Sequence, residues 1–150
     1  TVYQQGKPTG KTTKPEQWKK IYTLPYLTTK DIYLRWLQYR ILHNILPTNS
    51  YLVKIQVCES NKCFFFCKND KETTDHLFWH CEVIQLFIEQ LKPLLLNYIF
   101  HPTKQTLLLG DIDDMERNLL PLEVISFIYH CKRKTLPLSV SHFIAVLKHK

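Results

Sequence analysis

Glycine is scarce in this sequence, which has only three glycines in 150 residues. Sandwiches and barrels need frequent tight turns, and glycine is one of the residues that most often marks them. Leucine and isoleucine dominate the apolar residues instead. The composition therefore predicts a mainly α-helical protein, and at this length we expect one good core with at most a small satellite module.

The sequence also lacks a long uninterrupted apolar run. Its longest apolar stretch, residues 83–100, contains Glu89, Lys92 and Pro93, and charged residues are costly at the centre of a bilayer. No apolar segment near the N-terminus resembles a secretion signal, and the first residue is a threonine, so we expect an excerpt of a longer protein. These features predict an intracellular protein of the nucleus and cytoplasm that does not bind membranes.

Cysteine occurs in an odd number, which argues against a complete set of disulfides. We expect reduced thiols at all five positions: Cys58, Cys63, Cys67, Cys81 and Cys131.

Charge is placed unevenly along the chain. Residues 1–62 carry ten Lys/Arg against three Asp/Glu, residues 63–128 carry five against ten, and residues 129–150 carry five against none. Clustered cations gain affinity for nucleic acid by releasing counterions, so the two basic flanks predict a partner that bears phosphates. The alternative is that the net charge serves only solubility.

The first 17 residues combine glycine, proline, threonine and lysine and contain almost nothing apolar. Such a composition predicts a flexible basic arm at residues 1–17. Next, Thr28 as N-cap, with Asp31 three residues on, predicts a helix that ends at Pro47. Four apolar residues of this helix recur at helical spacing and predict its core stripe: Leu34, Leu37, Ile41 and Ile45.

The opposite face of the same helix carries Trp36, Arg40 and His43, with Arg35 beside them. An aromatic and basic face can stack a base and hold a phosphate, so Arg35, Trp36 and Arg40 are our first candidate group of nucleic-acid contacts. In the alternative interpretation Trp36 is buried against a second layer of the protein.

Further helices are expected at residues 47–55, 82–92, 94–100, 122–134 and after Ser139 or Ser141. Pro93 is expected to kink or break the chain between two of them, and residues 101–114 are expected to form a loop. Pro121 suits the first turn of its helix, and Cys131 is expected to be a core thiol. That helix ends in cations that suit the negative end of its dipole and form our second candidate group of phosphate contacts: Lys132, Arg133 and Lys134.

Four potential metal ligands fall within nineteen residues: Cys63, Cys67, His76 and Cys81. Their spacing, C-x3-C-x8-H-x4-C, supplies the two close pairs from which structural zinc sites are usually built. We therefore expect a CCHC zinc knuckle at about residues 58–82, inserted in a single small helical domain of residues 18–150.

The last two ligands impose a local condition on the backbone. His76 is predicted in the first turn of a helix that starts at Thr73. In an ideal helix a residue five positions later points well away, so Cys81 can meet His76 only if the helix distorts or ends near Trp79 and His80.

Other ligand sets remain open. His80 lies four residues after His76 and could replace Cys81 or support the ligands from outside. Cys58 could replace Cys63. If none of these residues is a ligand, the segment contains partly buried thiols, which free cysteine permits.

The segment KCFFFCKNDKETTDHLFWHC, residues 62–81, resembles the zinc-binding region that follows the polymerase in reverse transcriptases of non-LTR (LINE-type) retrotransposons. That family combines a cysteine knuckle with the tail E-T-x-x-H-L-F-x-x-C, which corresponds to Glu72, Thr73, His76, Leu77, Phe78 and Cys81. The likeness extends upstream through LRWLQYRILHNILPTNSYLVKI and downstream through LLLGD and FIYHCKRKTLPLSVSHF.

This resemblance implies a non-catalytic module that binds zinc and helps a parent polymerase hold element RNA or target DNA during target-primed reverse transcription. The implied partners are nucleic acid and the remainder of a retrotransposon polyprotein, which would carry the reverse transcriptase and endonuclease activities. The alternative is a structural or protein-docking zinc module. The family's first pair is usually C-x2-C, whereas three residues separate Cys63 from Cys67 here. The first ligand therefore stays open, as does a decayed copy of the element.

Possible enzyme signals do not combine into a site. One segment is rich in acids: Asp111, Asp113 and Asp114. A polymerase metal pair also needs a hairpin and a third carboxylate, and we expect these acids to cap a helix near Met115 instead. The stretch GKPTGKT lacks the spacing of a phosphate loop, and Cys81 beside His80 is adjacent in sequence only. We expect no enzyme activity from this chain.

Overall fold

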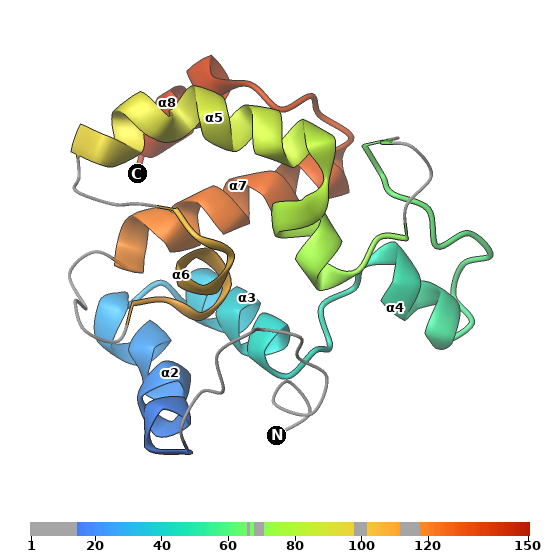
Figure 1. The fold of residues 1–150 in the computed structure, drawn as a ribbon, viewed down its shortest axis with the longest axis horizontal. Coiled ribbons are helices and arrows are strands. Elements are labelled where there is room, and N and C mark those ends of the chain that lie inside the picture. The colour runs from blue at the N-terminus through green and yellow to red at the C-terminus, as the bar shows by residue number, and fades with distance from the viewer. Residues whose placement is uncertain (1–14, 66, 68–70, 98–101, 112–117) are drawn as a thin grey trace.

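The computed structural model describes residues 15–65, 67, 71–97, 102–111 and 118–150 (Figure 1). The helical elements of this part of the chain are α2 (Pro15–Thr28), α3 (Ile32–Leu42), α4 (Asn49–Lys54), the π-helical turn η1 (His76–His80), α5 (Glu82–Asn97), α6 (Lys104–Leu109), α7 (Leu119–Lys134) and α8 (Val140–Lys148). Apart from helices, the described residues contain one isolated antiparallel bridge, between Lys62 and Lys71. The prediction of a mainly α-helical fold is confirmed.

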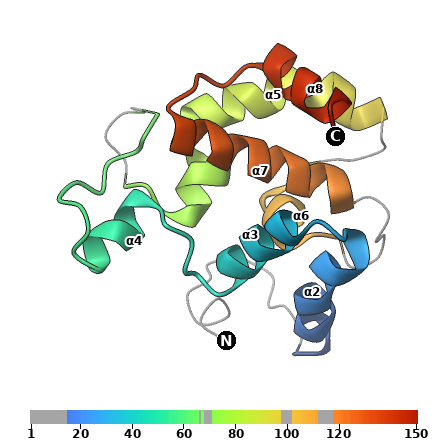
Figure 2. The same cartoon turned by 180° about the vertical axis from the view of Figure 1, so that it is seen from behind.

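The helices divide into a body and a side lobe. Helices α2, α3 and α5–α8 form what we call the helical body, in which α8 runs beside α5 and α7. Helix α4, the cysteine-bearing loop after it and η1 form the metal lobe, residues 48–81. Figures 1 and 2 show α4 at the side of the molecule away from α2. Within the described ranges every helix is too short or too polar to span a membrane.

Helix α2 begins at Pro15, so the last three residues of the predicted arm, 15–17, are helical. Residues 1–14 lie outside the described part of the chain. The predicted N-cap of the next helix is wrong, because Thr28 is the last residue of α2 and Asp31 caps α3 instead. The Asp31 carboxylate accepts hydrogen bonds from the N–H groups of Tyr33 and Leu34 at 2.8 and 3.3 Å, as an N-cap does.

Helix α3 ends at Leu42 rather than at Pro47. Three residues of its predicted core stripe are buried as expected: Leu34, Leu37 and Ile41. The fourth, Ile45, is 40% exposed, because it lies beyond the helix end and no longer follows the helical period. Leu42 and Leu46 are buried instead.

The core of the body is rich in phenylalanine where α5, α7 and α8 meet. The rings of Phe87, Phe127 and Phe143 lie with their centroids 5.3 to 6.2 Å apart, which is the range of favourable aromatic pairs. The predicted break at Pro93 is wrong, since α5 continues through it to Asn97. The last helix begins as predicted, because the Ser139 hydroxyl caps α8 by accepting from the N–H of His142.

The predicted loop at residues 101–114 contains a short helix, α6, whose capping box pairs Thr103 with Thr106. The chain leaves α6 through Gly110, which has φ +83°, a region that side-chain-bearing residues rarely adopt. A Cβ at this position would lie 2.9 Å from Asn118 Oδ1. The predicted helix start near Met115 lies outside the described residues. Helix α7 carries Pro121 in its first turn, as predicted.

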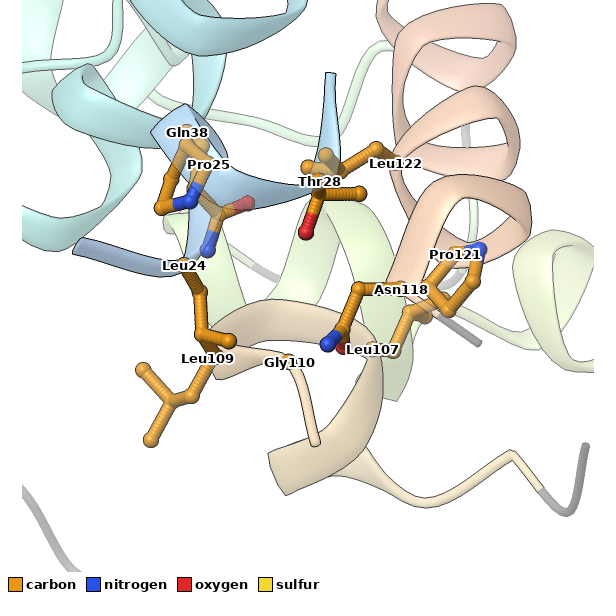
Figure 3. A pocket seen from close by; sticks show the side chains of 10 residues that line it. All are labelled: Leu24, Pro25, Thr28, Gln38, Leu107, Leu109, Gly110, Asn118, Pro121 and Leu122. Carbon is orange, nitrogen blue, oxygen red and sulfur yellow. The ribbon is translucent and has the colours of Figure 1, made fainter. Parts of the chain in front are cut away.

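A small cavity lies at the junction of α2, α3, α6 and α7 (Figure 3). Its volume is about 10 Å³, which is room for one water molecule and not for an organic ligand. Two of its lining polar atoms, Thr28 Oγ1 and Gln38 Oε1, are buried without a hydrogen-bond partner among the described residues. We therefore treat this cavity as part of the packing and not as a binding site.

Candidate metal centre

The four predicted ligands come together in the metal lobe. Their ligand atoms all lie within 4.8 Å of one another, and all four side chains are buried: Cys63, Cys67, His76 and Cys81. The sulfurs of Cys63 and Cys81 are 3.7 Å apart, and the Cys67 sulfur lies 2.9 Å from His76 Nε2. Segments on both sides of the polar loop thus supply one compact cluster of three sulfurs and one imidazole.

The π-helical turn η1 explains how His76 and Cys81 reach the same cluster. Cys81 donates its N–H to the carbonyl of His76 at 3.0 Å, a bond across five residues that widens the helix. Cys81 then has extended backbone angles. Upstream, the Thr73 hydroxyl accepts from the N–H of His76 at 3.1 Å and fixes the start of the turn. The predicted distortion of the helix before Cys81 is confirmed.

The separation of two sulfurs of the cluster fits a tetrahedral metal ion. Structural zinc sites take four ligands from cysteine and histidine, with Zn–S bonds of about 2.3 Å, so two sulfurs at corners of the tetrahedron are about 3.8 Å apart. The 3.7 Å between Cys63 and Cys81 agrees with that value. It is far longer than the bond of about 2.05 Å in a disulfide, and all five cysteines are free thiols.

The rival ligands lie outside the cluster. Cys58 is half-buried, and its thiol donates to the carbonyl of Ser60 at 3.4 Å. His80 has an exposed side chain, although it follows His76 by one helical turn. Among the described residues, neither belongs to a group of ligand atoms of this kind. The geometry therefore favours Cys63 and Cys81 over these two alternatives.

The thiols of the cluster are poorly suited to exist as thiolates without a nearby cation. Burial raises the pKa of Cys67 to about 12, with further increases from hydrogen bonds to Cys63 and Cys81. Burial also raises the pKa of Cys81, against the effect of backbone N–H groups at Ile84 and Val83, which lower it. A nucleophilic cysteine needs a depressed pKa. A divalent cation would supply the charge that three converging thiolates need, so the environment suits metal binding.

A buried carboxylate supports the cluster from outside. Glu72 is completely inaccessible to solvent. Its Oε2 accepts from the N–H of Phe64 at 2.7 Å, next to the ligand Cys63, and its Oε1 accepts from the N–H of Asn49 at 2.9 Å. Glu72 has no predicted role from the sequence. The signal that the sequence offered was the position of Glu72 in the family's tail motif. The structure gives the physical reason for that position, because a buried glutamate needs partners for its charge.

The charge partner of Glu72 is Lys132 of α7. The Lys132 ammonium lies 2.9 Å from Glu72 Oε1, with the lysine side chain only 10% exposed. Lys132 also donates to Asn49 Oδ1 at 3.1 Å, and Asn49 Nδ2 donates to the carbonyl of Lys62 at 2.8 Å. We call Glu72, Lys132 and Asn49 the polar clamp. It ties the metal lobe to the C-terminal part of the helical body.

The predicted nucleic-acid contacts fall into two groups in the structure: residues bonded within the protein and residues open to solvent. Lys132 and Arg35 are used internally: Lys132 pairs with Glu72, and Arg35 donates to the carbonyls of Thr29 and Tyr26 at 2.6 and 3.0 Å. Lys132 is therefore not the surface cation that its neighbours in sequence predicted. The other candidates remain open to solvent, fully or in part: Trp36, Arg40, Arg133 and Lys134.

Comparisons with known proteins agree with the cysteine cluster. The sequence profile of a protein family described as zinc-binding in reverse transcriptase matches residues 1–87, more than half of the chain. The matched region contains all four residues of the cluster and Glu72, whereas Lys132 lies beyond it. Comparison with curated proteins and with solved structures found no match.

Proposed function

This chain belongs to the family of zinc-binding regions of reverse transcriptases, and we propose that it is the non-catalytic, nucleic-acid-binding part of a non-LTR retrotransposon reverse transcriptase. The observation that carries the proposal is the convergence of four buried potential ligands in a chain whose family is described as zinc-binding in reverse transcriptase. The tail from Glu72 to Cys81 supports the assignment to non-LTR elements. The parent polyprotein would carry the polymerase and endonuclease activities.

The proposed ion is zinc, held by Cys63, Cys67, His76 and Cys81. Thiolate and imidazole ligands in a tetrahedron select zinc over the hard cations, which prefer oxygen. With all four positions taken by protein side chains, no position is left for a reacting water. When bound, the ion supplies charge compensation and a fixed geometry for the loop, which is the role of a structural site.

The proposed partner is element RNA or target DNA during target-primed reverse transcription. Support comes from the basic flanks of the chain and from the exposed cations at the end of α7, Arg133 and Lys134. Cations at a helix C-terminus are stabilised by the helix dipole and remain free to contact phosphates.

A salt titration tests this function directly. The affinity of the purified chain for RNA and for duplex DNA should fall steeply with salt, since each neutralised phosphate releases counterions. Replacing Arg133 and Lys134 with glutamine should reduce the slope of log K against log salt by about 1.5 to 2. The matched control is Lys92→Gln on α5, in the acidic middle of the chain, which should leave the slope unchanged. No salt-sensitive affinity for either nucleic acid would contradict the proposal.

A second candidate function is a structural or protein-docking module that does not touch nucleic acid. The polar clamp favours it, because Lys132, predicted as a phosphate contact, ties the metal lobe to α7 instead. The same titration separates the two functions: a chain that retains zinc but binds neither RNA nor DNA fits the docking module.

A further inference from the structure

A row of aromatic rings crosses the outer surface of α3 and reaches α2. Trp36 stacks on Tyr39, with ring centroids 5.1 Å apart and planes 21° apart. The row continues from Tyr39 to His43 at 4.2 Å and from His43 to Tyr22 at 5.4 Å. We call these four residues the aromatic ridge.

The ridge is open to solvent at one end and buried at the other. Trp36 is 52% exposed and Tyr39 is 37% exposed, whereas His43 and Tyr22 are half-buried. Helix α3 already buries its opposite face through Leu34, Leu37 and Ile41. Tyr22 packs against the core, whereas Trp36 and Tyr39 at the open end do not belong to it. Single exposed apolar residues are common on protein surfaces. Here one exposed tryptophan is stacked on a tyrosine at the end of a row of rings, which offers a flat apolar surface to a partner with flat rings of its own.

A cation lies beside the open end of the ridge. The Arg40 guanidinium is 5.5 Å from the centroid of the Trp36 ring, a cation–π distance. The exposed rings are thus adjacent to positive charge from the same helix.

We propose that the aromatic ridge is a stacking site for the bases of single-stranded nucleic acid, with a phosphate held by Arg40. This inference rests on the proposed nucleic-acid-binding function and specifies its ligand. Bases in a duplex are stacked on one another and cannot reach a convex helix surface, whereas unpaired bases stack readily on aromatic side chains. From Trp36 to Tyr39, the exposed part of the ridge, the helix rises about 4.5 Å, a length that suits one or two bases.

The test uses the full chain with zinc bound, a twelve-nucleotide oligo(U) or oligo(dT), and a duplex of equal phosphate number. Trp36→Ala should weaken single-strand binding about 5- to 100-fold, the usual effect of removing one stacking side chain. Duplex binding should change less than twofold. Ile32→Ala is the matched control, because Ile32 is a 79% exposed apolar residue of the same helix outside the ridge, and it should leave both affinities unchanged.

Tryptophan fluorescence gives a second readout. Trp18 is buried and Trp79 is half-buried, so quenching by single strands should come mainly from Trp36. Trp36→Phe keeps a ring for stacking and should retain most of the affinity while losing the quenching. This variant preserves an aromatic side chain if alanine proves disruptive to folding.

The outcomes separate the two proposals. The wild-type chain could bind single strands without fluorescence quenching, and Trp36→Ala could keep the same affinity. This result would overturn the stacking site and leave the nucleic-acid-binding function standing. Equal losses of single-strand and duplex binding would also overturn it, because a base-stacking site discriminates between them. Wild-type chain that binds neither would remove the proposed function, and a protein partner would then be the remaining use for the ridge.

Discussion

The helical body buries mainly leucine, isoleucine and phenylalanine, whereas the metal lobe buries cysteine, histidine, threonine and glutamate. Helix α4, in the lobe, has no buried residue at all. Among its described residues, the lobe adds Leu77 and Phe78 as fully buried large apolar side chains to the common core, with Phe65 and Trp79 partly buried against it. Apolar burial therefore stabilises the body, and the lobe depends on two sets of specific polar contacts: the ligand cluster and the polar clamp.

The largest expected effect comes from removing one ligand. His76→Ala should lose zinc and loosen residues 48–81 while the body keeps its helices, because structural zinc contributes on the order of 10 kcal/mol in small modules. Zinc content and amide hydrogen exchange, resolved by region, would measure both effects.

His80→Ala is the matched control, since the side chain of His80 is exposed one turn away. It should retain one zinc per chain. If His76→Ala kept its zinc and His80→Ala lost it, the ligand assignment would be wrong.

The polar clamp should give the next largest effect. Lys132→Met leaves the buried Glu72 carboxylate without its counter-charge, and breaking a buried ion pair in this way costs about 3–5 kcal/mol. The loss should appear as faster hydrogen exchange in the metal lobe, although Lys132 belongs to α7. Lys134→Met, an exposed lysine of the same helix, should change stability by less than about 0.5 kcal/mol.

A double variant sharpens this test. Glu72→Gln together with Lys132→Met should be less destabilising than the sum of the two single changes, because the second change removes a charge that the first left unpaired. Strict additivity would show that the two side chains do not interact.

A variant of the helical body should destabilise the body and leave the metal lobe unchanged. Gly110→Ala places a Cβ 2.9 Å from Asn118 Oδ1 and 3.0 Å from Leu24 Cδ1, at φ +83°. We expect a loss of about 1–3 kcal/mol in the body with zinc content unchanged. Thr135→Gly is a useful contrast, because Thr135 has φ 55° at the end of α7. Glycine there should stabilise the body by about 1 kcal/mol. Zinc loss in Gly110→Ala would contradict the independence of the two regions.

The last prediction concerns Cys131, a buried cysteine of the helical body. Burial raises the pKa of Cys131 to about 11, so the folded chain holds this proton more tightly than the unfolded chain does. The stabilising contribution is complete below about pH 9 and is lost as pH rises toward 11, at no more than about 1.4 kcal/mol per pH unit. Thermal unfolding of wild type and Cys131→Ala should therefore converge with rising pH over that range. A difference that does not vary with pH would contradict this.

The sequence predicted the cluster of three cysteines and one histidine because local spacing carries the signal. A C-x3-C pair and an H-x4-C pair around a polar loop have few other uses, and the mismatch between a five-residue step and the helical period predicted the distortion now seen as η1. Capping residues were less decisive. Thr28 and Asp31 are both good N-caps, and only the structure shows that α2 runs through Thr28.

Long-range and short-helix features were not predictable in the same way. Helix α6 has only six residues, too few to form alone, and is stabilised by burial of Leu107, Leu108 and Leu109 against other helices. The Glu72–Lys132 pair joins residues far apart in the chain, so no local pattern shows it. Lys132 also stands next to two exposed cations in sequence, although α7 turns it inward.

The most direct test is elemental analysis of the purified wild-type chain, followed by hydrogen exchange with and without a strong chelator. We predict one zinc per chain, and on chelation a selective loss of protection at residues 48–81 with the helical body largely retained. Material without stoichiometric zinc, whose exchange in the metal lobe is indifferent to the chelator, would contradict the account.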